Sequence, residues 1–202
     1  MRPILILAGY LLVAVVLPAE QFSPIESYEG PSTRLAAQVS CENNFFRDAR
    51  AKEVTHGPEH QVFLKVTDAF GRRDVPHFYI AEEGNNAVYI AGSVAVDGKG
   101  VIVISRMFAK LLGNTPALEG ILAHEMAHLA SDDGTIGCDQ WVLRDPELEK
   151  AADALAAKTV GYSPLRAFFH RIREITGGRD AADVDDRLLA IDALEKMEDN
   201  QR

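Results

Sequence analysis

The chain has 202 residues, 47% hydrophobic and 25% charged, which is typical of a globular protein and excludes a disordered or collagen-like chain. Its formal net charge of -9 argues against a nucleic-acid-binding protein, which needs clustered lysine and arginine side chains to contact phosphates. Two cysteines are too few for a disulfide-rich framework or for a zinc module with four cysteine ligands.

The N-terminal end carries one positive charge and then a continuous apolar run over residues 4–17. The run is shorter than the roughly 20 residues of a membrane-spanning helix and fits the apolar region of a signal peptide. We therefore expect residues 1–19 to direct export, to the periplasm or the medium. An uncleaved membrane anchor and a buried helix are the alternatives. Residues 20–31 are polar with two prolines and are expected to be a linker, which leaves residues 32–202 as one domain.

The patterning along this domain changes from helical to strand-like and back again. Short runs rich in Val, Ile, Tyr and Phe between turn residues predict strands, with Asp97-Gly98 as a hairpin turn. Apolar residues at helical spacing predict helices on either side of these strands. The predicted helices span residues 32–53, 59–70, 106–112, 116–131, 146–160, 164–176 and 184–197, and the predicted strands span residues 77–81, 87–92 and 101–105. The sequence therefore predicts an α+β fold, mostly helical with a small sheet.

The strongest chemical signal is the sequence His-Glu-Met-Ala-His at residues 124–128. Positions i and i+4 lie on one face of a helix, so His124 and His128 can present two imidazole nitrogens to one metal ion. Glu125 is turned about 100° around the helix. There its carboxylate can hold and deprotonate a water beside the ion. A chance match is the alternative, but the surrounding apolar residues indicate a buried helix, in which two unpartnered histidines would be costly.

A catalytic zinc site needs a third protein ligand, and the helix predicted to begin at residue 146 offers one. Glu149 and Asp153 are four residues apart and share a helix face. We expect Glu149 to bind the metal and Asp153 to accept a hydrogen bond from the second nitrogen of a ligand histidine. Glu147 is a competing ligand, but four residues later stands Ala151, which offers no such partner. A carboxylate that only favours the helix dipole is the other alternative for Glu149.

These motifs resemble the HtpX-like and CAAX-prenyl-protease-type family of gluzincin zinc metallopeptidases, which includes small exported members. The likeness covers roughly residues 60–197 and rests on four segments together. The first is an Asn-Ala strand at residues 85–92, and the second is the strand and helix before the metal helix, at residues 101–112. The third is the metal helix itself, at residues 118–129, and the fourth is a Glu-x-x-Ala-Asp segment followed by Gly-Tyr-x-Pro, at residues 149–169.

The resemblance implies a zincin-like metalloprotease domain in which a small mixed sheet lies beside the metal helix. It implies one Zn²⁺ per chain held by His124, His128 and Glu149, with Glu125 as general base and Asp153 supporting a ligand histidine. The substrate would lie extended along the Asn-Ala strand and be held by main-chain hydrogen bonds. The strand residues in question are Asn86, Ala87, Val88 and Tyr89.

The chain departs from the family pattern in two places. The metal helix is expected to stop at Ser131-Asp132-Asp133-Gly134, where family members often continue for another turn. The His-Pro that many members have before the last helix is replaced by Gly177-Gly178-Arg179-Asp180. The group that would stabilise the developing oxyanion is therefore unassigned. His170, Tyr162 and Arg187 are candidates, but for each of them an ordinary structural role is the favoured interpretation.

Two lone cysteines commonly pair in an oxidising compartment, so we expect a disulfide between Cys41 and Cys138. It would tie the first helix to residues 131–144, which lie between the metal helix and the helix of Glu149 and could also cover the cleft. Two buried free thiols, or Cys138 as an additional metal ligand, are the alternatives.

The sequence thus predicts a zinc endopeptidase of the cell envelope that cleaves proteins or peptides, with protein quality control as one expected role. A zinc-containing chaperone-like or protein-binding module is the main alternative, although such a module has no need of Glu125. Another zinc hydrolase of the envelope, such as an amidase, is the third. We expect no nucleic-acid partner, and membrane contact only through residues 4–17 if they are retained.

Overall fold

The fold, given by a computed structural model, is described for residues 51–81, 91–96, 99–131, 146–177 and 181–201. Within these residues it consists of a four-stranded sheet and six helices. The strands are β1 (Ala51–Glu53), β2 (His77–Ala81), β3 (Ala91–Val96) and β4 (Lys99–Ser105). The helices are α2 (Pro58–Ala69), α3 (Arg106–Leu112), α4 (Pro116–Ala130), α5 (Pro146–Val160), α6 (Tyr162–Thr176) and α7 (Ala181–Asp199).

The sheet is mixed, with the strand order β1-β2-β4-β3. The central strands β2 and β4 are parallel, and the edge strands β1 and β3 each pair antiparallel with their neighbour. Because side chains alternate along a strand, Ile102 and Ile104 of β4 point to the face that joins the main core. Val101 and Val103 point to the opposite face and belong to a separate apolar cluster.

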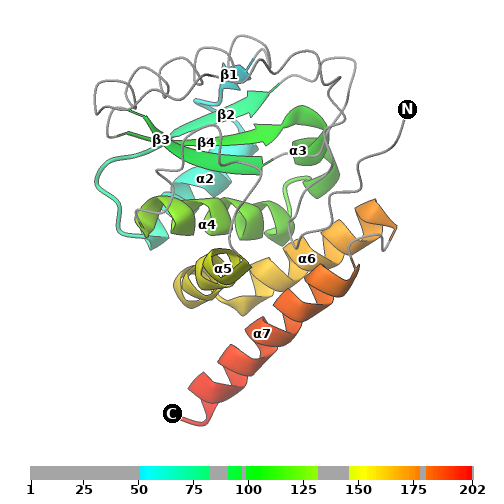
Figure 1. The fold of residues 1–202 in the computed structure, drawn as a ribbon. Helices are drawn as coiled ribbons and strands as arrows, with labels where there is room; N and C mark the ends of the chain where they lie inside the picture. Colours follow the sequence, from blue (N-terminus) through cyan, green and yellow to red (C-terminus); the bar gives the residue numbers. More distant parts are fainter. Residues whose placement is uncertain (1–50, 82–90, 97–98, 132–145, 178–180, 202) are drawn as a thin grey trace, which may run out of the picture.

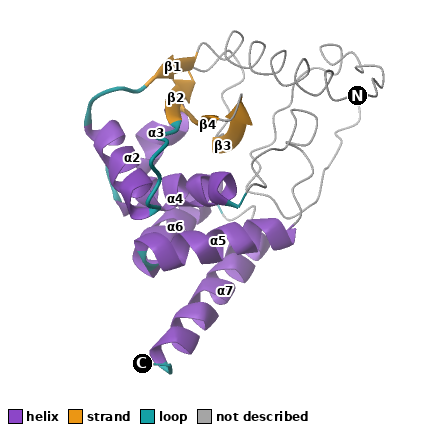
Figure 2. Ribbon diagram, turned by 90° about the vertical axis from the view of Figure 1, so that its left-hand side faces the viewer, coloured by secondary structure: helices purple, strands orange, loops and turns teal. Residues whose placement is uncertain are grey.

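The elements are stacked in layers, which Figure 1 shows with the sheet above and the long helices below. Helix α4 runs beneath the sheet and contacts β3 and β4 on one side and α5 and α6 on the other. Figure 2, turned by 90°, shows α7 as the outermost helix, extending away from the rest. None of the described helices is both long and apolar enough to cross a bilayer.

The central helix α4 is buried on all sides, and its sequence explains why. From Ala117 to Leu129 every residue except Glu119 is buried, and most of these residues are small or aliphatic. A helix that is apolar around its whole circumference has to be enclosed by other elements. The histidines of the metal motif are therefore held within the best-packed part of the domain, where their positions are tightly restricted.

The helix predictions agree closely with the structure after residue 58. Helices α3 and α5 have the predicted bounds, and α2, α4, α6 and α7 differ from them by at most three residues at either end. The prediction of helix for residues 51–53 is wrong, because these residues form β1 and pair with β2. The remainder of that predicted helix, residues 32–50, lies outside the described residues.

The predicted strands agree with the described sheet, in which two strands extend beyond their predicted bounds. Strand β2 has the predicted bounds, and β4 begins two residues earlier than predicted. The edge strand β3 contains residues 91 and 92 as predicted and continues to residue 96, and residues 87–90 of the predicted strand lie outside the described part. Val96 lies opposite Lys99, the register that the hairpin prediction requires. The α+β fold class, mostly helical with a small mixed sheet, is confirmed.

Candidate metal centre

The two histidines of the motif lie one turn apart on α4 and face the same way. Their rings are perpendicular, with an interplanar angle of 89° and centroids 4.7 Å apart. The Nε2 atoms of His124 and His128 are 3.1 Å from each other, so both imidazoles aim at one point. The side chains are 4% and 1% exposed. This arrangement follows from the four-residue spacing once the helix is formed.

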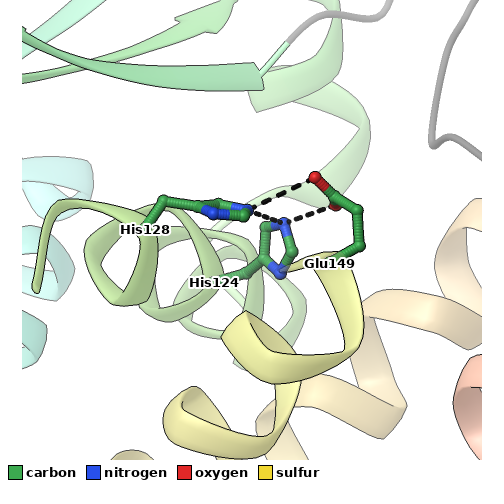
Figure 3. Close-up of side chains that lie close together, drawn as sticks. All are labelled: His124, His128 and Glu149. Atoms are coloured by element: carbon green, nitrogen blue, oxygen red, sulfur yellow. Dashed lines mark hydrogen bonds and ion pairs between the residues drawn. The ribbon is translucent and has the colours of Figure 1, made fainter. Parts of the chain in front are cut away.

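Glu149 completes a group of three ligand atoms from the first turn of α5, as Figure 3 shows. Its Oε2 lies 3.2 Å from Nε2 of His124, and its Oε1 lies 3.4 Å from Nε2 of His128. The three ligand atoms all lie within 4.8 Å of one another. Two imidazole nitrogens and one carboxylate are a donor set that zinc prefers, with room for a further ligand. The residues present therefore fit a catalytic zinc ion.

Behind this group, His124 is oriented by a buried acid. Its Nδ1 donates a hydrogen bond to Oδ1 of Asp153 at 2.8 Å, which leaves Nε2 pointing at Glu149. Asp153 lies one turn after Glu149 on α5 and is buried. A carboxylate on the far nitrogen of a ligand histidine sets the tautomer and ring orientation that a metal requires.

Asp153 is in turn held by an arginine from α7. Arg187 donates from Nε to Oδ2 of Asp153 at 2.7 Å and from Nη2 to Oδ1 at 2.8 Å. Its guanidinium lies over the ring of Phe169, 4.7 Å from the ring centre, and Nη2 is 3.6 Å from Oε2 of Glu149. Helix α7 thus brings a buried cation to the two buried acids of α5.

The neighbouring charges raise the pKa of His124 and lower the pKa of Glu149. Burial alone would lower the pKa of His124, but hydrogen bonds and charges from Asp153 and Glu149 outweigh it and raise that pKa to about 9. Burial alone would raise the pKa of Glu149, but the two histidines and Arg187 hold it below its usual range. In the metal-free protein at neutral pH, His124 therefore carries a proton that metal binding must release.

Glu125 follows His124 on α4 and is 3% exposed. Its Oε2 is buried and has no hydrogen-bond partner among the described residues. A buried carboxylate oxygen without a partner is costly, so an unpartnered one beside a ligand group points to a role with a bound water or substrate.

The model of peptidase family M48 matches residues 55–169, more than half of the 202 residues. The chain belongs to peptidase family M48. The matched segment contains α4 and α5, and with them all five residues of the predicted metal site and its support. It ends within α6, before α7. No curated protein and no solved structure matches the chain.

Membership of family M48 assigns the chain to the zinc metallopeptidases. This agrees with the buried group of His124, His128 and Glu149, which could hold one ion. The resemblance inferred from the motifs is thus confirmed at the level of the family. The narrower HtpX-like or CAAX-protease type goes beyond what the match to family M48 shows.

The structure separates the three candidates for oxyanion stabilisation. His170 is exposed on α6 and lines a surface pocket formed with the ends of α3 and α4. Tyr162 begins α6, where burial and the acid Glu198 of α7 raise its pKa. Arg187 is the candidate that contacts the metal group, through Asp153 and Glu149. Its two hydrogen bonds to Asp153 make it a support for that acid.

The role of Arg187 was not predicted, although the sequence carries a signal for it. Val184 and Ile191 are fully buried residues of α7 and stand three positions before and four positions after Arg187. A charged residue within such an apolar stripe needs a buried partner of opposite charge.

Several predicted functional residues lie outside the described part of the chain. They are the substrate-strand residues Asn86, Ala87, Val88 and Tyr89 and the cysteines Cys41 and Cys138. The export segment 1–19, the linker 20–31 and residues 132–144 of the possible cleft cover also lie outside it.

Proposed function

We propose that the chain is a zinc-dependent metalloendopeptidase in which His124, His128 and Glu149 bind the ion and Glu125 is the general base. The observation that carries the proposal is the convergence of three buried ligand atoms within 4.8 Å of one another in a chain of family M48. When bound, zinc would supply a Lewis acid that polarises the scissile carbonyl and acidifies the attacking water.

The protein side chains provide proton transfer and hold the ligands in position. Glu125 accepts the proton of the attacking water at its unpartnered oxygen and delivers it to the leaving amine nitrogen. Asp153 keeps the proton of His124 on Nδ1, so that Nε2 is free to bind the ion. The enclosure of α4 between the sheet and α5 and α6 prevents these side chains from moving apart.

For the substrate, we propose extended protein or peptide segments that add to the β3 edge of the sheet. Among the described strands, β3 lies at an edge of the sheet, and it contacts α4, which carries the two histidines. An edge strand offers unpaired main-chain groups, which bind a chain largely irrespective of its sequence. Residues 86–89, which the sequence also proposes for substrate binding, lie outside the described residues.

The biological setting is proposed from the sequence alone. Residues 4–17 favour export, or an anchored position at a membrane, and hence substrates in the cell envelope. Cleavage of misfolded envelope proteins by an enzyme of the HtpX-like type would suit broad main-chain recognition. Non-reducing peptide mapping of the purified protein would test the Cys41–Cys138 disulfide and locate the mature N-terminus together.

The decisive experiment compares Glu125→Gln with wild type, both loaded with zinc, in cleavage of casein. We expect the variant to keep its zinc and to lose activity by about 10²- to 10⁴-fold, the usual contribution of a general base. Glu119→Gln is the matched control, because Glu119 lies on the same helix but pairs with Lys65. Equal cleavage by wild type and Glu125→Gln would refute the assignment. Zinc binding without cleavage by the wild type would favour the chaperone-like alternative.

A further inference from the structure

Arg187 is almost fully buried, with 2% of its surface exposed, and it lies against the two buried acids of α5, Glu149 and Asp153. It forms two hydrogen bonds to Asp153 and lies within ion-pair distance of Glu149. A buried charge is tolerated only when such partners compensate the loss of water. The interaction therefore stabilises Arg187 and the two carboxylates, and it lies directly beside the proposed zinc ligands.

The same two carboxylates are the ones that a bound metal would compensate. Glu149 is the proposed ligand, and Asp153 faces the ion through the imidazole of His124. Arg187 and a metal ion would thus act on the same negative charge, one permanently and one only when bound. Without Arg187, the metal-free site would hold two neighbouring buried carboxylates that lack the cation lying against both.

We propose that Arg187 is a built-in counter-cation that keeps Asp153 and Glu149 in place before metal binds. Arg187 is then a positioning residue, which acts on His124 through Asp153, and the metal-free protein folds with its ligands already arranged. Helix α7, which lies beyond the segment that matches family M48, becomes part of the metal centre. The inference rests on the proposed zinc site.

The test measures thermal unfolding of wild type and Arg187→Met, each with a chelator and with added zinc. We expect Arg187→Met to melt at a lower temperature without metal and to gain more from zinc than wild type does. Removing a unit positive charge near a dication should raise the zinc affinity of the folded state by at least about tenfold, even in a water-like dielectric. Arg187→Lys keeps the charge and should return the zinc-induced shift towards the wild-type value.

Arg166→Met is the matched control. Arg166 also joins two helices, since it reaches from α6 to Asp192 at 2.7 Å and to Glu195 on α7. It has no part in the metal group, so its loss should lower both melting temperatures equally and leave the zinc-induced shift unchanged. If Arg187→Met behaves in the same way, Arg187 only anchors α7 and the proposal is overturned.

A second variant decides the case in which Arg187→Met fails to fold with or without zinc. The double variant Asp153→Asn, Arg187→Met removes both buried charges, so it should fold without metal if charge compensation is the role of the arginine. If the double variant is also unfolded, Arg187 is needed for packing and the proposal fails. A wild-type melting temperature that zinc does not change would instead refute the zinc site, and the comparison of single and double variants would still test the counter-cation.

Discussion

At His124, burial and two neighbouring acids have opposite effects on the pKa of the imidazole. The ring is enclosed by protein, which favours its neutral form, yet Asp153 and Glu149 approach its two nitrogens at 2.8 Å and 3.2 Å. The effect of the two acids is larger than that of burial, so the pKa of His124 rises from 6.5 to about 9. The proton on Nε2 occupies the position that a metal ion would take, so proton and metal exclude each other.

This pKa makes the stability of the metal-free protein depend on pH in a defined direction. Because the folded-state pKa of His124 lies above its unfolded value, the stabilisation is complete below pH 6.5 and is lost as the pH rises towards 9. The loss should be about 3 kcal/mol, since one pKa unit corresponds to about 1.4 kcal/mol. Urea denaturation in the presence of a chelator at pH 6, 7.5 and 9 measures it.

The control for this pH dependence is His124→Gln, which should flatten the profile over the same range. Glu149 does not interfere, because its pKa is lowered by the neighbouring histidines and its contribution is lost only under acidic conditions. A wild-type profile that stays level between pH 6.5 and 9 would contradict the charge state assigned to His124.

At the scale of residues, the spacing of the site residues along the sequence determined which of their contacts could be predicted. The pairs His124 and His128 on α4, and Glu149 and Asp153 on α5, are each four residues apart, and helix geometry alone puts each pair on one face. The way that α4 meets α5 depends on packing, which no local pattern encodes. Arg187 lies 34 residues beyond its partner Asp153, so its contact could be foreseen only as the need of a buried charge.

At the scale of elements, the contact between α4 and α6 is the most extensive one between described helices. A Cβ placed on Gly120 of α4 would lie 2.3 Å from the backbone oxygen of Pro164 and 2.9 Å from Cβ of Phe168. The absence of a side chain therefore lets the backbone of α6 lie directly against the metal helix. This glycine sets the distance between the two helices.

We expect Gly120→Ala to destabilise the protein by about 1–3 kcal/mol, the usual cost of overpacking. The sign is informative, because the same change inside an unobstructed helix stabilises by roughly 0.5–1 kcal/mol. Urea denaturation measures the change, and Gly120→Ser should cost more than alanine. A neutral or stabilising alanine would show that α4 and α6 can separate without loss.

Local sequence signals explain which elements were predictable. Helix α3 begins where Ser105 accepts a hydrogen bond from the backbone N–H of Phe108 at 3.3 Å, and it ends at Gly113, which has a positive φ of 61°. Strand β1 has no such signal, since Ala51-Lys52-Glu53 has no strand preference. It is a strand because β2 offers it an antiparallel partner, which is a tertiary effect.

At the scale of the whole molecule, the metal group is assembled from three helices that are distant in the sequence. Helix α4 supplies both histidines, α5 both acids, and α7 the arginine that holds Asp153. The outermost helix in Figure 2 therefore has a direct connection to the chemistry. Removal of α7 should damage the metal site as well as the core, although α7 lies outside the segment that matches family M48.

We expect a chain ending at Gly177 to lose cooperative unfolding and, because no folded state then remains to bind the ion, to lose zinc-dependent stabilisation as well. It would remove Val184 and Ile191, which are fully buried, and expose the apolar surface that they cover. Burial of each such side chain contributes about 1.5–3 kcal/mol to the free energy of unfolding. It would also leave Asp153 without its cation, at a cost of about 3–5 kcal/mol. The sum is comparable with the roughly 5–15 kcal/mol that stabilises a typical domain. Thermal unfolding followed by circular dichroism, with and without zinc, measures both losses.

A shorter truncation after Leu194 is the matched control for this experiment. It removes Met197, which is 53% exposed, and the end of α7, but it keeps Arg187, Ile191 and the pairing of Arg166 with Asp192. The missing residues bury little apolar surface, so the loss of stability should stay below about 1 kcal/mol and the response to zinc should be unchanged. If the chain ending at Gly177 still unfolds cooperatively and is stabilised by zinc like wild type, α7 is an appendage and the three-helix metal centre is wrong.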